Sequence, residues 1–183
     1  NILIGGKDIF RPDNNVYSLR RKVGMIFQKP CVFPISIFDN VVFGVREVTK
    51  IPKKDYPDLA EKVLREVFLW EEVKDRLNEK ATTLSQGQQQ RLTLARTLAV
   101  GPDVLLMDEP TSSLDPKSTA AIEKLVISLK NRHTILWVTH QHDQAHSIAD
   151  RVLVLKEGQV VDLPAPIERQ ENPSSLEDVL YNS

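Results

Sequence analysis

Three short apolar runs of the sequence are each followed by residues that could do chemistry on a phosphate. In chain order these are Gln28 after 23–27, Asp108 and Glu109 after 104–107, and His140 after 134–138. The runs are continuous rather than alternating, which is typical of strands in a parallel sheet with both faces covered. Because ligands bind beyond the carboxyl ends of such strands, we expect the four side chains to converge on one site.

This set of side chains suits metal-assisted phosphoryl transfer. One carboxylate can hold Mg²⁺, a hard cation that prefers oxygen ligands, and the other can orient or activate water. An amide can contact metal and water, and an imidazole can donate to a developing phosphate charge. An acid pair after one strand is also common in ordinary polar loops. Because all three predicted strands are followed by polar residues of this kind, we favour a phosphoryl-transfer site over ordinary polar loops.

A second group of candidate residues opens a helix. In the segment Leu84-Ser85-Gln86-Gly87-Gln88, Ser85 and Gln88 have the spacing of a capping box. A helix start offers unpaired amide donors and a partial positive charge, so it can bind a phosphate. Gly87 would allow the phosphate to approach the backbone closely. The alternative is an ordinary capped helix without a ligand.

Helical patterns lie between the apolar runs, which indicates an α/β layered fold with a mainly parallel sheet. Apolar residues share one helical face in three segments: 58–70, 88–100 and 118–129. Residues 39–100 carry no strong strand signal. We therefore interpret them as a helical subdomain, inserted into an α/β core formed by residues 1–38 and 101–163.

The end of the sequence predicts a hairpin and a tail. The runs 151–155 and 159–162 flank Glu157-Gly158, a pair that favours a tight turn between two strands. Residues 164–183 are interpreted as a polar C-terminal tail, with a possible last helix at 174–181.

Composition narrows the class of protein. The 183 residues are 41% hydrophobic and 27% charged with a net charge of −1, so no strong attraction to nucleic acid is implied. Cys31 is the single cysteine, which excludes an internal disulfide and fits a reducing compartment. No apolar run is long enough for a membrane span, and residues 1–6 lack a signal-peptide pattern. The chain opens in a strand-like run without methionine, which favours a piece of a longer protein.

The order of these motifs resembles the nucleotide-binding domain of ABC transporters. Gln28 matches the glutamine loop, Leu84 to Gln88 the family signature, and His140 the switch histidine. Val104 to Glu109 matches the Walker B strand with Glu109 at the catalytic carboxylate, and Ser112 to Asp115 matches the loop that follows it. The resemblance covers nearly the whole chain and implies a P-loop NTPase-like ABC ATPase fold.

The resemblance also implies a role for each residue and the cofactors ATP and Mg²⁺. Asp108 and Gln28 would serve Mg²⁺, Glu109 would polarise the attacking water, and His140 would contact the γ-phosphate. Two such domains would form a homodimer around two ATP molecules. The residues that would act across this dimer are Ser85, Gln86, Gly87 and Gln88, which bind the partner's ATP, and Asp115, which links the two sites.

Within the family the chain looks most like the ATPases of phosphate importers, on the segments Phe27 to Pro30, Ser36 to Val41, Leu84 to Arg91 and Glu171 to Pro173. Importers of molybdate, tungstate or amino acids use similar ATPases. The family implies permease subunits, whose coupling helices would enter the groove beside Gln28, and indirectly an extracytoplasmic solute-binding protein. It also implies a peripheral place on the cytoplasmic face of the cell membrane, and no nucleic acid.

Two departures from the family pattern matter. Gln86 stands where glycine is usual, although Gly87 is kept. The 183 residues contain no phosphate-loop pattern G-x-x-x-x-G-K-S/T, and Gly5-Gly6-Lys7-Asp8 is better interpreted as a tight turn between two edge strands. We therefore expect that this chain by itself does not hydrolyse ATP, although the full-length subunit would.

Three alternatives remain open at this stage. One is an ABC-like ATPase of DNA repair, although the stretch between glutamine loop and signature lacks the heptads of a long coiled coil. Another is a non-enzymatic remnant or regulatory partner that lends its signature face to a complete subunit. The third is a zinc site formed by His140, His142 and His146.

Overall fold

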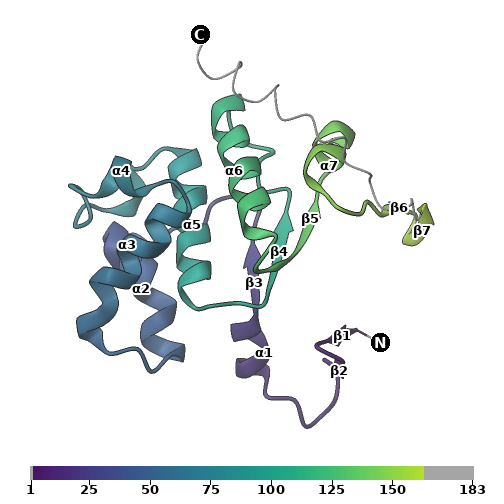
Figure 1. The fold of residues 1–183 in the computed structure, drawn as a ribbon, viewed down its shortest axis with the longest axis horizontal. Coiled ribbons are helices and arrows are strands. Elements are labelled where there is room, and N and C mark those ends of the chain that lie inside the picture. The colour runs from purple at the N-terminus through teal and green to yellow at the C-terminus, as the bar shows by residue number, and fades with distance from the viewer. Residues whose placement is uncertain (1, 163–183) are drawn as a thin grey trace. The chain divides into compact units, whose positions relative to one another are not determined.

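The computed structural model of the chain describes residues 2–162 (Figure 1). The chain divides into two compact units, residues 1–140 and residues 141–183. The candidate site residues, from Gln28 to His140, all belong to the first unit, so their arrangement can be described within it.

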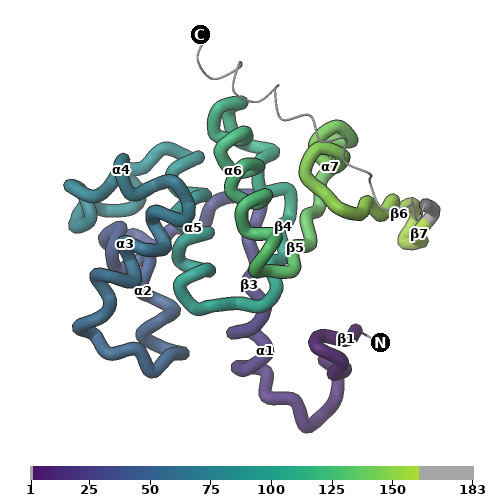
Figure 2. The backbone as a smooth tube through the Cα atoms, viewed as in Figure 1, coloured from purple at the N-terminus to yellow at the C-terminus, as the bar shows by residue number. Residues whose placement is uncertain are grey.

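A three-stranded parallel sheet lies in the first unit. Its strands, in the order in which they pair, are β3 (Val23–Ile26), β4 (Val104–Asp108) and β5 (Thr134–Val138). The register pairs Ile26 with Met107 and Met107 with Trp137, so the three carboxyl ends meet at one edge of the sheet. Figure 2 shows β3 and β4 side by side, although a long helical segment separates them along the chain. The three predicted strands and the parallel sheet are therefore confirmed.

The chain between β3 and β4 is helical, as the sequence predicted. Its elements are α2 (Ile37–Val48), η1 (Lys53–Asp55), α3 (Tyr56–Glu66), α4 (Trp70–Val73), η2 (Ala81–Thr83) and α5 (Gln86–Ala99). Helix α5 packs against α2 and α3 on one side and against β3 on the other. In Figure 1 it stands between the other helices of this segment and the sheet. Whether residues 39–100 act as a separate subdomain stays a prediction.

The prediction of a single helix over 58–70 is wrong at its end, because the chain reverses at Phe68. Phe68 has a φ of 54° and its amide donates to the Arg65 carbonyl, while the Leu69 amide donates to the Leu64 carbonyl. This pair of bonds is the Schellman ending of a helix, with Leu69 packing back into the core. Glycine usually occupies the left-handed position, so phenylalanine gave no sequence signal for the stop.

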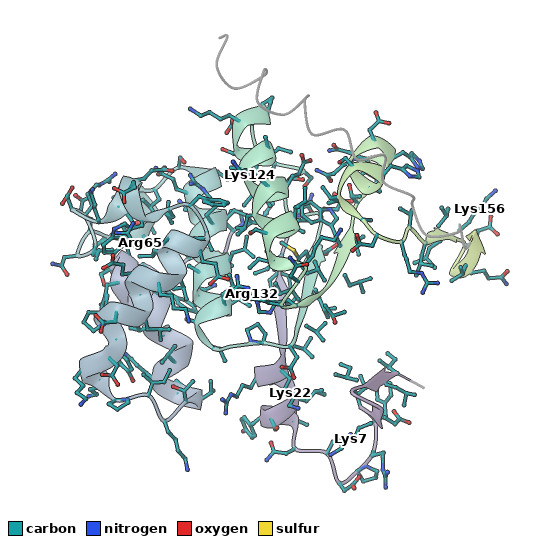
Figure 3. All side chains as sticks on the ribbon, viewed as in Figure 1. Lys7, Lys22, Arg65, Lys124, Arg132 and Lys156 are labelled. Atoms are coloured by element: carbon teal, nitrogen blue, oxygen red, sulfur yellow. The ribbon has the colours of Figure 1, made fainter. Side chains whose placement is uncertain are left out.

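Helix α6 (Pro116–Leu129) follows β4 and buries Ile122, Leu125, Val126 and Leu129 in the core that the helical segment and the sheet share. Arg132, just beyond α6, forms an ion pair with Glu66 at the end of α3. Arg65, labelled in Figure 3, lies next to Glu66 on α3 and stacks 5.2 Å above the Trp70 ring centroid. The ion pair joins the end of α6 to the helical segment, whereas the Arg65–Trp70 contact lies within that segment.

The N-terminal residues form a small hairpin, followed by α1 (Val16–Lys22). The hairpin consists of the antiparallel strands β1 (Leu3–Ile4) and β2 (Lys7–Asp8). Gly5 and Gly6 have φ values of 56° and 76°, which is the backbone of a two-residue type I′ turn. The interpretation of this segment as a tight turn between short strands is confirmed.

The second unit contains α7 (His142–Ile148) and a hairpin of β6 (Val154–Lys156) and β7 (Gln159–Asp162). Glu157 and Gly158 form its turn with φ values of 52° and 77°, which confirms the predicted hairpin. The helix predicted at 174–181 lies outside the described residues. In the described part of the chain, the helices are too short or too polar to cross a membrane.

Candidate functional site

The carboxyl ends of β4 and β5 bring Glu109 and His140 into contact. Asp108 ends β4 and pairs in register with Val138, which ends β5. The Glu109 amide donates to the Val138 carbonyl oxygen at 3.0 Å, and His140 Nδ1 lies 3.0 Å from Glu109 Oε1. A carboxylate only accepts hydrogen bonds, so Nδ1 donates in this contact when Glu109 is ionised. The structure thus brings these candidate residues together at one edge of the sheet.

Gln28 joins the same edge through Ser112. Its Nε2 donates to Ser112 Oγ at 3.0 Å, and the Ser112 hydroxyl in turn donates to the Glu109 carbonyl oxygen at 3.1 Å. One hydroxyl can accept and donate at once, so both bonds can exist together. The side chain that follows β3 is therefore connected to the backbone that follows β4, as the sequence predicted from the parallel strands.

Glu109 has an unusual backbone for a residue with a side chain. Its φ is 42°, in the left-handed region, where L-residues with a side chain carry strain. The amide is held by the Val138 carbonyl, and the carbonyl is held by the Ser112 amide at 3.2 Å and the Ser112 hydroxyl. The neighbouring bonds therefore fix a sharp turn directly after β4, which aims the carboxylate at His140.

Asp108 offers an exposed carboxylate at the end of β4. Among residues 2–162, no three His, Cys, Asp or Glu side chains gather closely enough to hold a metal ion by themselves. Mg²⁺ is commonly bound by one or two carboxylates together with phosphate oxygens and water, so this donor set fits Mg²⁺ that arrives with a nucleotide. The Gln28 amide oxygen could add a ligand. The alternative zinc site needs His142 and His146 of the second unit, and it stays untested.

The start of α5 has the capping box that its sequence predicts. The Gln88 amide donates to Ser85 Oγ at 3.3 Å, and the Ser85 amide donates to Gln88 Oε1 at 2.9 Å. Ser85 and Gln86 are exposed. A helix start of this kind presents amide donors toward solvent, where a phosphate could accept from them. The binding roles of these residues stay predictions.

Gly87 has a packing role that the sequence did not reveal. A Cβ atom placed on Gly87 would lie 2.3 Å from Ser118 Oγ and 2.7 Å from Ser118 Cβ, far inside van der Waals contact. Ser118 is fixed by Asp115, the N-cap of α6, which accepts from the Ser118 amide at 3.0 Å and from its hydroxyl at 2.6 Å. These two bonds hold the pKa of Asp115 below its ordinary value. Glycine is thus required where α5 meets α6, apart from any ligand.

The loop after Glu109 connects the two groups of candidate residues. Gln86 Nε2 donates to Ser113 Oγ at 2.9 Å, and Ser113 Oγ lies 3.5 Å from the Gln28 carbonyl oxygen. Gln86, which stands at a position where the resemblance expects glycine, therefore uses its side chain to hold this loop. The strand-end residues and the start of α5 form one continuous hydrogen-bonded surface.

Glu72 and Arg91 anchor the first turns of α5, and sequence reasoning missed both. Arg91 Nη1 and Nη2 reach the two carboxylate oxygens of Glu72 at 2.7 and 3.1 Å, and Nη1 also donates to the Phe68 carbonyl at 2.6 Å. Glu72 also accepts from Gln88 Nε2 at 2.8 Å. Partial burial acts to raise the pKa of Glu72, but the bonds from Arg91 and Gln88 outweigh it and lower that pKa.

Replacing Arg91 by methionine is expected to lower the free energy of unfolding by about 1–2 kcal/mol, because hydrogen bonds of a charged group are lost while the alkyl packing is kept. The Arg91 side chain is 11% exposed, so water replaces these bonds poorly. Urea unfolding at neutral pH measures the change. Lys74→Met is the control: its pair with Glu71 is well exposed and should contribute less than about 0.5 kcal/mol.

The same variant should reveal the ionisation of Glu72. A carboxylate with a lowered pKa in the folded state stabilises the protein above its unfolded pKa, near 4.3, and loses that stabilisation as pH falls through the folded value. The stability difference between wild type and Arg91→Met should therefore shrink below about pH 4.3. A difference that is constant from pH 7 to pH 3 would show that the ion pair does not carry the effect.

A protein-family comparison matches residues 1–112 to the model described as ABC transporter. The curated proteins that are similar to the chain include two phosphate-import proteins of Mycobacterium. "Phosphate import ATP-binding protein PstB 2" of Mycobacterium tuberculosis is 46% identical over 181 residues, which cover 99% of this chain and 65% of the relative. "Phosphate import ATP-binding protein PstB" of Mycobacterium intracellulare is 52% identical over 162 residues, covering 88% and 56%.

Solved structures add matches of fold, and cbiO1 is one of them. The structure of cbiO1 from Clostridium perfringens, titled as part of the ABC transporter complex cbiONQ, superposes with a TM-score of 0.77 at 30% identity. The match covers 87% of this chain and 63% of that one. The chain therefore spans about two thirds or less of the length of the proteins it matches.

Proposed function

The chain belongs to the ABC transporter family, and from this premise we propose that it serves in an ATP-binding subunit that couples ATP hydrolysis to solute import. One observation carries the proposal: Gln28, Glu109 and His140 meet through hydrogen bonds at the carboxyl ends of neighbouring parallel strands, with Asp108 beside them. This is the edge of an α/β sheet where ligands bind.

In the proposed reaction the side chains at this edge orient water, stabilise charge and bind the metal. Glu109 accepts a hydrogen bond from the attacking water and orients it. When both ring nitrogens of His140 carry a proton, Nδ1 donates to the Glu109 carboxylate and Nε2 can donate toward the γ-phosphate. Asp108 and the Gln28 amide oxygen would hold Mg²⁺, which would neutralise charge on the phosphate oxygens. The His140–Glu109 contact of 3.0 Å supports this division, because it sets the carboxylate before any substrate arrives.

The start of α5 is proposed to act on the nucleotide of a second copy. Ser85, Gln86, Gly87 and Gln88 would face the phosphates held by the partner in a homodimer, and Asp115 would link the two sites. The exposure of Ser85 and Gln86 at a capped helix start supports this assignment, because an anion can reach the amides there. Within each copy, the hydrogen bond from Gln86 to Ser113 connects the start of α5 to the loop that follows Glu109.

Inorganic phosphate is the proposed solute, because the two relatives at 46% and 52% identity are named for phosphate import. Permease subunits would bind the ATPase at the cytoplasmic face of the cell membrane, and an extracytoplasmic solute-binding protein would deliver the phosphate to them. Nucleic acid has no role in this proposal. Uptake of labelled phosphate by cells that lack or carry the natural gene tests the solute, with molybdate, tungstate and amino acids as competitors.

The activity is tested by phosphate release from millimolar Mg-ATP, using the natural gene product with its permease partners. We expect turnover that requires both Mg²⁺ and Glu109. A polypeptide of the 183 residues alone is expected to show none, because it contains no phosphate-loop pattern to hold the β and γ phosphates. Turnover that is insensitive to Glu109 in the complete protein would refute the proposed function, and Glu109-dependent turnover by the 183 residues would refute the second expectation.

A further inference from the structure

Gln90, in the second turn of α5, contacts the backbone next to Gln28 and the backbone next to Glu109. Its side-chain Nε2 donates to the Phe27 carbonyl oxygen at 3.0 Å and to the Pro110 carbonyl oxygen at 2.9 Å. Phe27 directly precedes Gln28, and Pro110 directly follows Glu109. A single amide group therefore joins the helix to the chain beside two candidate catalytic residues.

The burial of this amide makes the arrangement specific. Gln90 is fully buried, and its Oε1 has no hydrogen-bond partner among the described residues. Both contacts of Nε2 are to carbonyl oxygens, so only the NH₂ group can occupy that position and the amide cannot be flipped. An unpartnered buried acceptor lowers stability, which a purely structural residue would avoid. The amide is better explained by the geometry that its two donors impose.

That geometry concerns three elements at once. The two carbonyls mark the ends of β3 and β4, and α5 is the helix whose first turn carries the capping box. Glu109, next to one of the two carbonyls, already has a strained backbone whose φ must be held by its surroundings. A shift of α5 would displace Phe27 and Pro110 together, and with them the neighbouring residues Gln28 and Glu109.

We infer that Gln90 is a positioning residue: through its two hydrogen bonds it sets the distance between Gln28 and Glu109 and couples both to the place of α5. The inference rests on the proposed function, because the residues that it positions are the proposed metal-binding and catalytic groups. Gln90 itself faces two carbonyls in the core and takes no part in the reaction.

The test compares Gln90→Met with Gln89→Met in the natural gene product with its permease partners. Both changes remove an amide of similar size from neighbouring positions of α5, but Gln89 Nε2 contacts the Leu84 carbonyl and not the strand ends. We expect kcat for ATP hydrolysis to fall at least about tenfold in Gln90→Met, with KM for ATP changed less than about threefold, because misplaced catalytic groups slow the chemical step. Gln89→Met should keep kcat within about twofold of wild type.

Two further measurements separate positioning from stability. In wild type, the Gln90 side-chain amide protons should exchange slowly with solvent. In Gln90→Met the backbone amides of residues 28, 109 and 111–113 should exchange faster than in Gln89→Met. Equal kcat in the two variants, or a loss of stability with unchanged kcat per folded molecule, would overturn the inference. So would fast exchange of the Gln90 amide in wild type, a measurement that needs no variant. A wild-type protein without ATP turnover would instead overturn the proposed function.

Discussion

Replacing Glu109 by glutamine is expected to lower ATP turnover by the complete protein about 1,000-fold while ATP binding is kept, because the side chain retains its shape but loses its ability to accept a proton from water. A thousandfold loss corresponds to about 4 kcal/mol of transition-state stabilisation. The amide oxygen that Glu109→Gln introduces can still accept from His140 Nδ1, so the 3.0 Å contact and the strained turn should persist. Single-turnover phosphate release and equilibrium ATP binding measure the two effects separately.

The control is Glu47→Gln, which makes the same chemical change at an exposed position of α2 and should leave turnover unaltered. A second variant for the same experiment is His140→Ala, which removes the donor that holds the Glu109 carboxylate. It should also lower turnover, by about 100-fold, without a large change in ATP affinity. Glu109→Gln turnover within tenfold of wild type would place the catalytic base elsewhere and remove the main support for the assigned roles.

The parts of the site that the sequence predicted are those that follow from local patterns. Apolar runs of four or five residues identified the strands, and the residue after each run had to lie at the same sheet edge once the strands were parallel. The capping box of Ser85 and Gln88 was predicted for the same reason, since both partners lie within one helical turn. The two hairpins follow from turn residues with positive φ at Gly5, Gly6 and Gly158.

The parts that the sequence did not predict depend on contacts between distant segments. Gln90 looks like any other residue in a run of glutamines, and its task becomes visible only when β3 and β4 are placed beside α5. Glu72 and Arg91 are ordinary helical charges until α4 packs against the start of α5. The end of α3 at Phe68 was missed because a left-handed residue with a large side chain leaves no local signal.

Gly87 shows that a residue predicted for one role can have a second physical cause that the sequence does not reveal. Its small size was interpreted as room for a phosphate, and the start of α5 is indeed exposed beside it. The structure adds Ser118, which occupies the space where a Cβ atom of residue 87 would lie. Glycine at this position therefore satisfies packing between α5 and α6, whether or not a ligand binds nearby.

Gly87→Ala is accordingly expected to lower the free energy of unfolding by about 1–3 kcal/mol and ATP turnover by about 100-fold, because the start of α5 must move away from α6 to admit the methyl group. Ser118 cannot rotate to make room, since its hydroxyl is bound to Asp115 Oδ2 at 2.6 Å and its Cβ would still lie 2.7 Å away. Urea unfolding and ATP turnover of the same preparations measure both effects.

The cause can be isolated with Ser118→Gly, which removes both atoms that the new methyl group would strike. In that background Gly87→Ala should become neutral or slightly stabilising, because alanine is a better helix former than glycine by up to about 1 kcal/mol. The sign of the change would then reverse, with a coupling free energy between the two sites of about 1–3 kcal/mol. If the two changes instead add within about 0.5 kcal/mol, the contact between α5 and α6 is not what requires glycine, and the phosphate-binding interpretation of Gly87 alone remains to explain it.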